Sequence, residues 1–155
     1  LFDCDALFFC VAISALQDVL ENSSPYCQPD SVFFDTCSVK MLPSKWMQEL
    51  LPEGSRIITT HPMFGPDSYQ QTDRQLPMVM CDISVGTDQF DCWANYFTTL
   101  SLQVVKMTPD EHDQLTAYSQ GITHFVGRVL GDLQLQPSSI DPHGYKPLLK
   151  IIEQT

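Results

Sequence analysis

Apolar runs mark the strands expected in the first half of the chain. Residues 5–13, DALFFCVAI, are almost all apolar, and a second run, SVFFDTCSV, covers residues 31–39. A third, RIITTHPMF, begins at Arg56. Runs without strict alternation are typical of strands that are buried on both faces of a parallel sheet. The pattern therefore predicts three buried parallel strands.

Helix signals separate these runs. Ser14 can cap a helix over residues 14–21, and two prolines mark the loop that follows it. A second helix is expected over residues 43–51, before the Pro-Glu-Gly turn that leads into the third strand. Strand and helix alternating at this spacing predict a right-handed parallel unit of the doubly wound α/β type.

The pattern changes after the third strand. A polar loop, GPDSYQQTDRQ at residues 65–75, has room for a ligand, and it precedes an apolar strand at residues 77–83. A helix over residues 87–100 and a short strand over residues 102–107 follow. We expect residues 1–107 to form one domain and residues 108–155 to begin a second, helical one.

A long helix opens the second part of the chain. Thr108, Pro109 and Glu111 provide a cap residue, a proline at the first helical position and a glutamate at the third. Apolar residues then recur at helical spacing, which predicts about 25 helical residues with one face in a core. These residues are Leu115, Tyr118, Ile122, Phe125, Val129 and Leu133. A linker over residues 134–142 and a further helix from Gly144 complete the pattern.

Composition narrows the class of protein. The 155 residues are 43% hydrophobic and 17% charged, as in an ordinary globular domain. No apolar run approaches the ~18 residues of a membrane span, and the first residues carry acids where a signal peptide has lysine or arginine. We expect a soluble, intracellular protein, located in the cytoplasm or, in a plant, in the plastid.

Charge and cysteine spacing exclude further classes. The net charge of -11 makes a phosphate-backbone interface unfavourable, so no nucleic-acid partner is expected. The six cysteines form no Cys-x-x-Cys pair, and several lie in apolar runs. We interpret them as reduced core thiols rather than disulfides or a metal site. The four histidines have no metal-ligand spacing either, so no metal is expected.

Candidate chemistry lies where the strands end, because ligands of parallel sheets bind at the carboxyl edge. His61 follows the third apolar run and is fixed by Pro62, so it is a candidate general base. Ser38 ends the neighbouring run and could orient a hydroxyl or the histidine. The alternatives are a structural or surface histidine and a serine that turns the chain.

A second polar group lies on the long helix. Gln120 and His124 are four residues apart and share a face with Gly127 and Gly131, and Ser119 is adjacent. Such a small, polar face suggests packing against another backbone or lining a cleft. His112 is interpreted as a solvated residue of the first helical turn.

Several of these strings together resemble the prephenate/arogenate dehydrogenase family. HPMFGP at residues 61–66 follows DTCSVK at residues 35–40 and DALFFCVAIS at residues 5–14. EHDQLTAYSQGITHFVGRVL at residues 111–130 resembles the first long helix after that family's nucleotide-binding domain. The resemblance implies the C-terminal half of a Rossmann-like doubly wound sheet, followed by the first helices of an α-helical dimerisation domain.

The resemblance also implies an activity and a set of site residues. Family members oxidise prephenate or arogenate with NAD or NADP and release carbon dioxide as the ring becomes aromatic. By resemblance, His61 would deprotonate the ring hydroxyl, and Ser38 would hydrogen-bond in the same cluster. Ser119, Gln120 and His124 would face the substrate, and Gln120 favours arogenate over prephenate. Val11, Thr36 and Ser38 would contact the cofactor, and a homodimer is expected.

Departures from the family pattern temper this interpretation. No Gly-x-Gly-x-x-Gly turn occurs, and Ala12 stands where a proline is common. The chain resembles the middle of a dehydrogenase and lacks an expected substrate-carboxylate arginine, so we expect it to be inactive alone. Open alternatives are a non-catalytic oligomerisation or regulatory module and a related hydroxy-acid dehydrogenase. The first strand would leave an apolar edge, which predicts self-association.

Overall fold

The computed structural model describes residues 4–65 and 75–153. Nearly all of the polar loop expected at residues 65–75 therefore lies outside the described residues. The chain forms two compact units, Leu1–Asp113 and Gln114–Thr155, which are described separately. The functional division into nucleotide-binding and helical domains stays a prediction.

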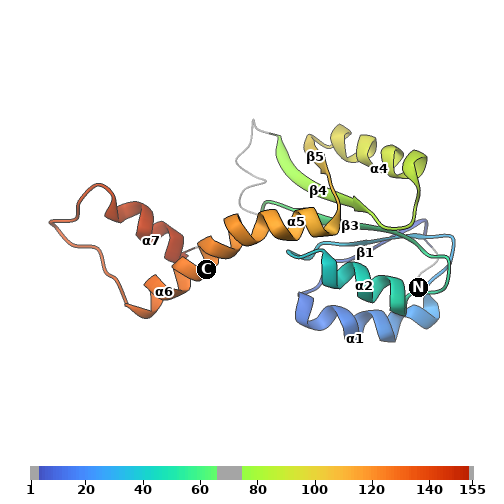
Figure 1. Cartoon of the computed structure of the whole chain (residues 1–155), viewed down its shortest axis with the longest axis horizontal. Helices are drawn as coiled ribbons and strands as arrows, with labels where there is room; N and C mark the ends of the chain where they lie inside the picture. Colours follow the sequence, from blue (N-terminus) through green and yellow to red (C-terminus); the bar gives the residue numbers. More distant parts are fainter. Residues whose placement is uncertain (1–3, 66–74, 154–155) are drawn as a thin grey trace. The chain divides into compact units, whose positions relative to one another are not determined.

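The first unit contains a five-stranded sheet with the strand order β1-β2-β3-β4-β5 (Figure 1). β1, β2 and β3 are mutually parallel, as predicted, whereas β4 runs antiparallel to β3, and β5 runs parallel to β4. The strands are Ala6–Phe9, Val32–Asp35, Arg56–Pro62, Leu76–Asp82 and Leu102–Lys106. The α/β class and its Rossmann-like half sheet are confirmed.

The first two strands are shorter than the apolar runs that predicted them. β1 ends at Phe9 because helix α1, Ile13–Ser23, begins soon after it. Ala12 precedes that helix in an extended conformation, so the prediction that Ser14 caps it is wrong. Helix α2, Met41–Leu50, likewise begins before the expected Pro43. The apolar runs continue into the loops that follow β1 and β2. The hydrophobic pattern therefore did not indicate the residue at which each strand ends.

Helices cover both faces of the sheet. Figure 1 shows α1 and α2 on one face and α4, Thr87–Thr99, on the other. A short 3-10 helix, Ser24–Tyr26, follows α1. Successive strand residues point to opposite faces, so each inner strand supplies two cores.

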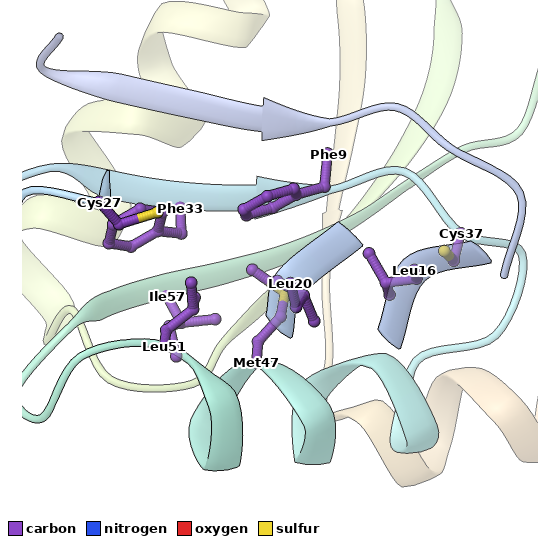
Figure 2. Close-up of a cluster of buried hydrophobic side chains, with 9 residues drawn as sticks. All are labelled: Phe9, Leu16, Leu20, Cys27, Phe33, Cys37, Met47, Leu51 and Ile57. Carbon is purple, nitrogen blue, oxygen red and sulfur yellow. The ribbon is translucent and has the colours of Figure 1, made fainter. Parts of the chain in front are cut away.

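The two cores divide the apolar residues of the strands between them. Figure 2 shows the core beneath α1 and α2, which contains Phe9, Leu16, Leu20, Cys27, Phe33, Cys37, Met47, Leu51 and Ile57. The core beneath α4 contains Val32, Phe34, Ile58, Met78, Met80, Phe90, Ala94, Phe97 and Leu102. Burial on both faces explains why the strands lack polar alternation.

One edge of the sheet is open and apolar. β1 ends the strand order, and Phe8 stacks on Phe34 with ring centroids 4.4 Å apart while remaining 41% exposed. An apolar depression beside it is lined by Ala6, Phe8, Cys92, Trp93, Tyr96, Phe97 and Leu100. The expected apolar edge is therefore present, and the self-association inferred from it stays a prediction.

A nearly continuous helical stretch follows β5. It consists of α5, Pro109–Thr116, a π-helical turn η2, Ala117–Gly121, and α6, Ile122–Asp132. The predicted capping box is present, because Glu111 N donates to Thr108 Oγ1 over 3.2 Å and Thr108 N donates to Glu111 Oε2 over 2.8 Å. The long helix is thus confirmed, with a π turn that the periodicity did not indicate.

The apolar face of this helix is not a core among the described residues. Tyr118 is 82% exposed and Phe125 is 69% exposed, so the expectation of a buried face is wrong. Helix α7, Tyr145–Glu153, packs instead on the small-residue face, where a Cβ at Gly131 would lie 3.7 Å from Ile152 Cγ2. The small face packs against a neighbouring helix, as the sequence suggested.

The cysteines are all free thiols, and the prediction that they lie in the core holds for only some of them. Cys27, Cys37 and Cys81 are buried, whereas the other three are exposed. Burial raises the pKa of Cys37 to about 12 and that of Cys81 to about 11, so these thiols are protonated and unreactive. In the described part of the chain, no cluster of potential ligands could hold a metal ion, and no helix is long and apolar enough to cross a membrane.

Substituting Thr108→Ala should lower the free energy of unfolding by about 1 kcal/mol, because it removes the cap hydroxyl of α5. Urea unfolding measures the change. Thr123→Ala, the same substitution inside α6, is the control and should cost nothing or stabilise slightly. Equal losses in the two variants would contradict the role of the capping box.

Candidate active site at the ends of β2 and β3

A buried ion pair organises the carboxyl end of β2. Lys40 Nζ lies 2.5 Å from Asp35 Oδ2 and donates to Thr60 O over 2.6 Å, and the side chains of Asp35 and Lys40 are both fully buried. Asp35 also accepts hydrogen bonds from the amides of Cys37 and Thr60. A buried charge is tolerated when it is paired and fully hydrogen-bonded. This pair fixes the loop over residues 36–40 and ties β2 to β3.

His61 lies near the end of β3 and is 4% exposed. Its Nδ1 lies 2.9 Å from Nε2 of His112, whose Nδ1 lies 2.7 Å from Asp113 Oδ1. The interpretation of His112 as solvated is wrong, since it is 1% exposed. It occupies the fourth position of α5, and in a helix capped in this way that position faces inward. Three residues thus form a continuous row that ends at His61.

Asp113 also caps helix α2. Its Oδ1 accepts from Lys40 N over 2.7 Å, and its Oδ2 accepts from Met41 N over 2.9 Å. α2 has no side-chain cap of its own at Lys40, so a carboxylate from α5 satisfies the first amides of the helix. Burial alone would raise the pKa of Asp113, but hydrogen bonds from Met41, His112 and Lys40 hold it below its usual range.

The electrostatics keep His61 neutral. Burial lowers its pKa to about 4, and the electrostatic effects of nearby His112 and Lys40 act in the same direction, whereas Asp113 opposes the shift. The imidazole is therefore uncharged at pH 7 and can accept a proton or a hydrogen bond. Nδ1 is engaged by His112, and Nε2 makes no hydrogen bond to the described residues. Among the described residues, His61 therefore has Nδ1 held by His112 and Nε2 without a hydrogen-bond partner.

The predicted cofactor contacts lie on two adjacent loops. Cys37 Sγ is 3.9 Å from Val11 O, so the loops after β1 and β2 touch. Val11 and Thr36 are partly buried, and Ser38 is exposed. Within the described residues Ser38 makes no hydrogen bond to His61, although Ser38 follows β2 and His61 lies near the end of the neighbouring strand β3.

The remaining predicted residues belong to the helical unit. Ser119 is exposed and donates to Leu115 O over 2.9 Å, Gln120 is half-buried, and His124 is exposed. Ser119 and Gln120 lie in the π-helical turn, a feature often found at functional sites. The substrate role of all three stays a prediction.

Sequence reasoning missed three members of the site, namely Lys40, His112 and Asp113. The fourth position after the Thr108 cap could have indicated that His112 faces inward. The capping role of Asp113 had no local signal, because it joins residues far apart in the sequence. Lys40 was noted only as part of a string, and nothing in the pattern indicated its burial.

Comparison with known proteins assigns the family. The family model described as "Prephenate dehydrogenase, nucleotide-binding domain" matches residues 1–106. The chain belongs to the prephenate dehydrogenase family. The resemblance inferred from the sequence is therefore confirmed, and members of this family contain a nucleotide-binding domain of the kind to which β1–β5 belong.

Curated relatives and solved structures agree with this assignment. The chain is 35% identical to Arabidopsis thaliana "Arogenate dehydrogenase 1, chloroplastic" and 32% identical to "Arogenate dehydrogenase 2, chloroplastic", in each case over 97% of its length. It spans 24% and 44% of those proteins. Synechocystis arogenate dehydrogenase has the same fold, with a TM-score of 0.74 and 19% identity over 96% of this chain and 58% of the other.

A ligand-bound structure also shares the fold. Prephenate dehydrogenase from Aquifex aeolicus in complex with hydroxyphenyl propionate and NAD+ matches with a TM-score of 0.75 and 15% identity. The match covers 99% of this chain and 58% of the other.

Replacing Lys40 by Met should lower the free energy of unfolding by about 3–5 kcal/mol, because Asp35 would stay buried without its counter-charge. Chemical denaturation measures the loss. Lys45→Met is the control, because Lys45 and Glu49 form an exposed pair at 3.8 Å that contributes at most about 0.5 kcal/mol. A loss at Lys40 no larger than that at Lys45 would argue against the ion pair.

The lowered pKa of His61 predicts a loss of stability in acid. The unfolded chain takes up a proton near pH 6.5 but the folded chain only near pH 4, so stability should fall as the pH drops between these values. His61→Asn should lose less stability between pH 7 and pH 5 than the unsubstituted chain. His124→Asn, at an exposed position, should behave like the unsubstituted chain. If the stability of the unsubstituted chain and of both variants depended on pH in the same way, the lowered pKa of His61 would be refuted.

Proposed function

We propose that this chain supplies the catalytic part of an NAD- or NADP-dependent arogenate or prephenate dehydrogenase that forms an aromatic ring by oxidative decarboxylation. The observation that carries the proposal is the neutral, buried His61 at the carboxyl end of β3, with Nδ1 engaged and Nε2 available. Family membership supplies the nicotinamide-dependent chemistry. The site supplies a base where ligands of such sheets bind.

His61 would act on the ring hydroxyl of the substrate. Nε2 accepts the hydroxyl proton as the carbon that bears the oxygen loses a hydride. The C–C bond to the ring carboxylate then breaks as carbon dioxide leaves. Its electron pair completes the aromatic ring and passes to the ring oxygen, which takes the proton back from His61. A general base in such a position contributes roughly 10²–10⁴-fold to the rate. Ser38, on the loop fixed by Lys40, would hydrogen-bond to the same hydroxyl.

The residues of the chain fit the nicotinamide end of the cofactor. Val11, Thr36 and Ser38 lie on adjoining loops at the carboxyl ends of β1 and β2, where open α/β sheets bind nucleotides. When bound, the nicotinamide supplies the hydride acceptor. The 155 residues contain no Gly-x-Gly-x-x-Gly turn for the pyrophosphate, so we expect no activity from them alone.

The helical unit would recognise the rest of the substrate. Gln120, in the π-helical turn, favours arogenate, and Ser119 and His124 would face the same ligand. The names of the two Arabidopsis relatives agree with arogenate as the substrate. Their chloroplastic location and the free thiols fit a reducing compartment, which we propose to be the cytoplasm or a plastid.

The exposed apolar stripe on the helix supports a homodimer. Its exposed members are Leu115, Tyr118, Ile122, Phe125, Val129 and Leu133. A contiguous apolar patch of this kind marks an interaction site on soluble proteins. The same stripe would serve the alternative function, that of a non-catalytic oligomerisation module. Such a module would not need the hydrogen-bonded residues His61, His112 and Asp113.

A chimera tests the proposed activity. This chain would replace the matching region of Arabidopsis arogenate dehydrogenase 2, and reduced nucleotide would be followed by absorbance with arogenate or prephenate. We expect turnover that falls about 10²–10⁴-fold in His61→Asn. Ser14→Ala, on the exposed face of α1, is the control and should leave the rate unchanged. A folded but inactive chimera, or an active one indifferent to His61→Asn, would disprove the proposal.

A further inference from the structure

We propose that Asp113, acting through His112, holds His61 in the single tautomer whose Nε2 carries a lone pair, and that His112 and Asp113 are positioning residues for proton abstraction. The inference rests on the proposed function, because the lone pair matters only if Nε2 accepts a substrate proton. It is drawn from the row of hydrogen bonds that joins α2, α5 and β3.

The direction of the row is fixed at its Asp113 end. The backbone amides of Lys40 and Met41 can only donate, so both carboxylate oxygens of Asp113 are acceptors. An ionised carboxylate has no proton to give, so His112 Nδ1, 2.7 Å from Oδ1, must be the donor in their hydrogen bond. The backbone of α2 thereby determines which nitrogen of His112 carries the proton.

The same logic passes from His112 to His61. In the neutral imidazole that we propose for His112, the proton on Nδ1 leaves a lone pair at Nε2. His61 Nδ1, 2.9 Å away, must then donate to it. The proton of neutral His61 is therefore on Nδ1, and Nε2 is left as an acceptor. The other tautomer of His61 would place two lone pairs face to face.

The row also compensates the charge that develops during proton transfer. Burial and nearby Lys40 disfavour a proton on His61, and Asp113 is the group that opposes them. The Asp113 carboxylate is linked to the imidazole by His112, so its negative charge stabilises the imidazolium formed when Nε2 takes a proton. In serine proteases, an aspartate that hydrogen-bonds directly to the catalytic histidine is worth about 10⁴-fold in turnover.

Nitrogen NMR of the 155-residue chain with ¹⁵N-labelled histidine tests the tautomer directly. At pH 7 the expected spectrum shows His61 Nε2 as an unprotonated nitrogen and Nδ1 as a protonated one, with the signals assigned by their loss in His61→Gln. In Asp113→Leu no acceptor remains for His112 Nδ1, so the tautomer of His112 is no longer fixed and His61 should show a mixture of its two tautomers. Asp110→Leu, at an exposed position on the same helix, should retain the original pattern.

A protonated Nε2 on His61 in the unsubstituted chain would overturn the proposal, and this result needs no variant to fold. An unchanged single tautomer of His61 in folded Asp113→Leu would overturn it equally. His112→Phe removes the acceptor and should give a mixture of the two tautomers, whereas an unchanged single tautomer would contradict the row.

Kinetics in the chimera separate this inference from the proposed function. Asp113→Leu should lower kcat at least 10-fold with little change in KM, because the substrate still binds but His61 is no longer held in the tautomer that takes its proton. A loss confined to KM would contradict a positioning role. If the chimera is inactive while the tautomers are as expected, the proposed function fails together with the positioning role, and only the assignment of the tautomer stands.

Discussion

The buried carboxylate of Asp35 is the constraint on which the rest of the site depends. A charge removed from water must be matched, and here Lys40 and the amides of Cys37 and Thr60 match it. Meeting this requirement fixes the loop after β2, aligns the end of β3 and places the first turn of α2. The loop that carries Ser38 and the strand that carries His61 are thereby held to each other.

A second carboxylate extends this framework to the helix that follows the sheet. Asp113 satisfies the first amides of α2 and the Nδ1 of His112, and His112 reaches His61. Each of these polar groups has a hydrogen-bond partner, and His112 can therefore be buried beside another imidazole. Polar contacts between residues far apart in the sequence form the site. The sheet that supports these residues is stabilised by its two apolar cores.

Much of the sheet could be predicted because burial on two faces leaves a strong mark on sequence. Phe33 and Phe34 point to opposite cores, so the run that contains them has no polar alternation. The antiparallel direction of β4 left no such mark, since residue periodicity is the same in both directions. His61 was identified from its place at a strand end, whereas Asp113 was missed because capping of α2 from α5 depends on tertiary structure. The apolar stripe on the long helix did not predict burial, because helical periodicity shows that a face is apolar and not what covers it.

A double-mutant cycle between Asp113→Leu and His61→Asn tests the central claim most directly, because the described hydrogen bonds join the two residues through His112. Residues without a shared partner have additive effects on the free energy of unfolding, to within about 0.3–0.5 kcal/mol, whereas members of one hydrogen-bonded network differ from additivity by about 0.5–3 kcal/mol. We expect a coupling energy in the second range. Additive losses would show that Asp113 caps α2 without acting on His61, and would contradict a connected site.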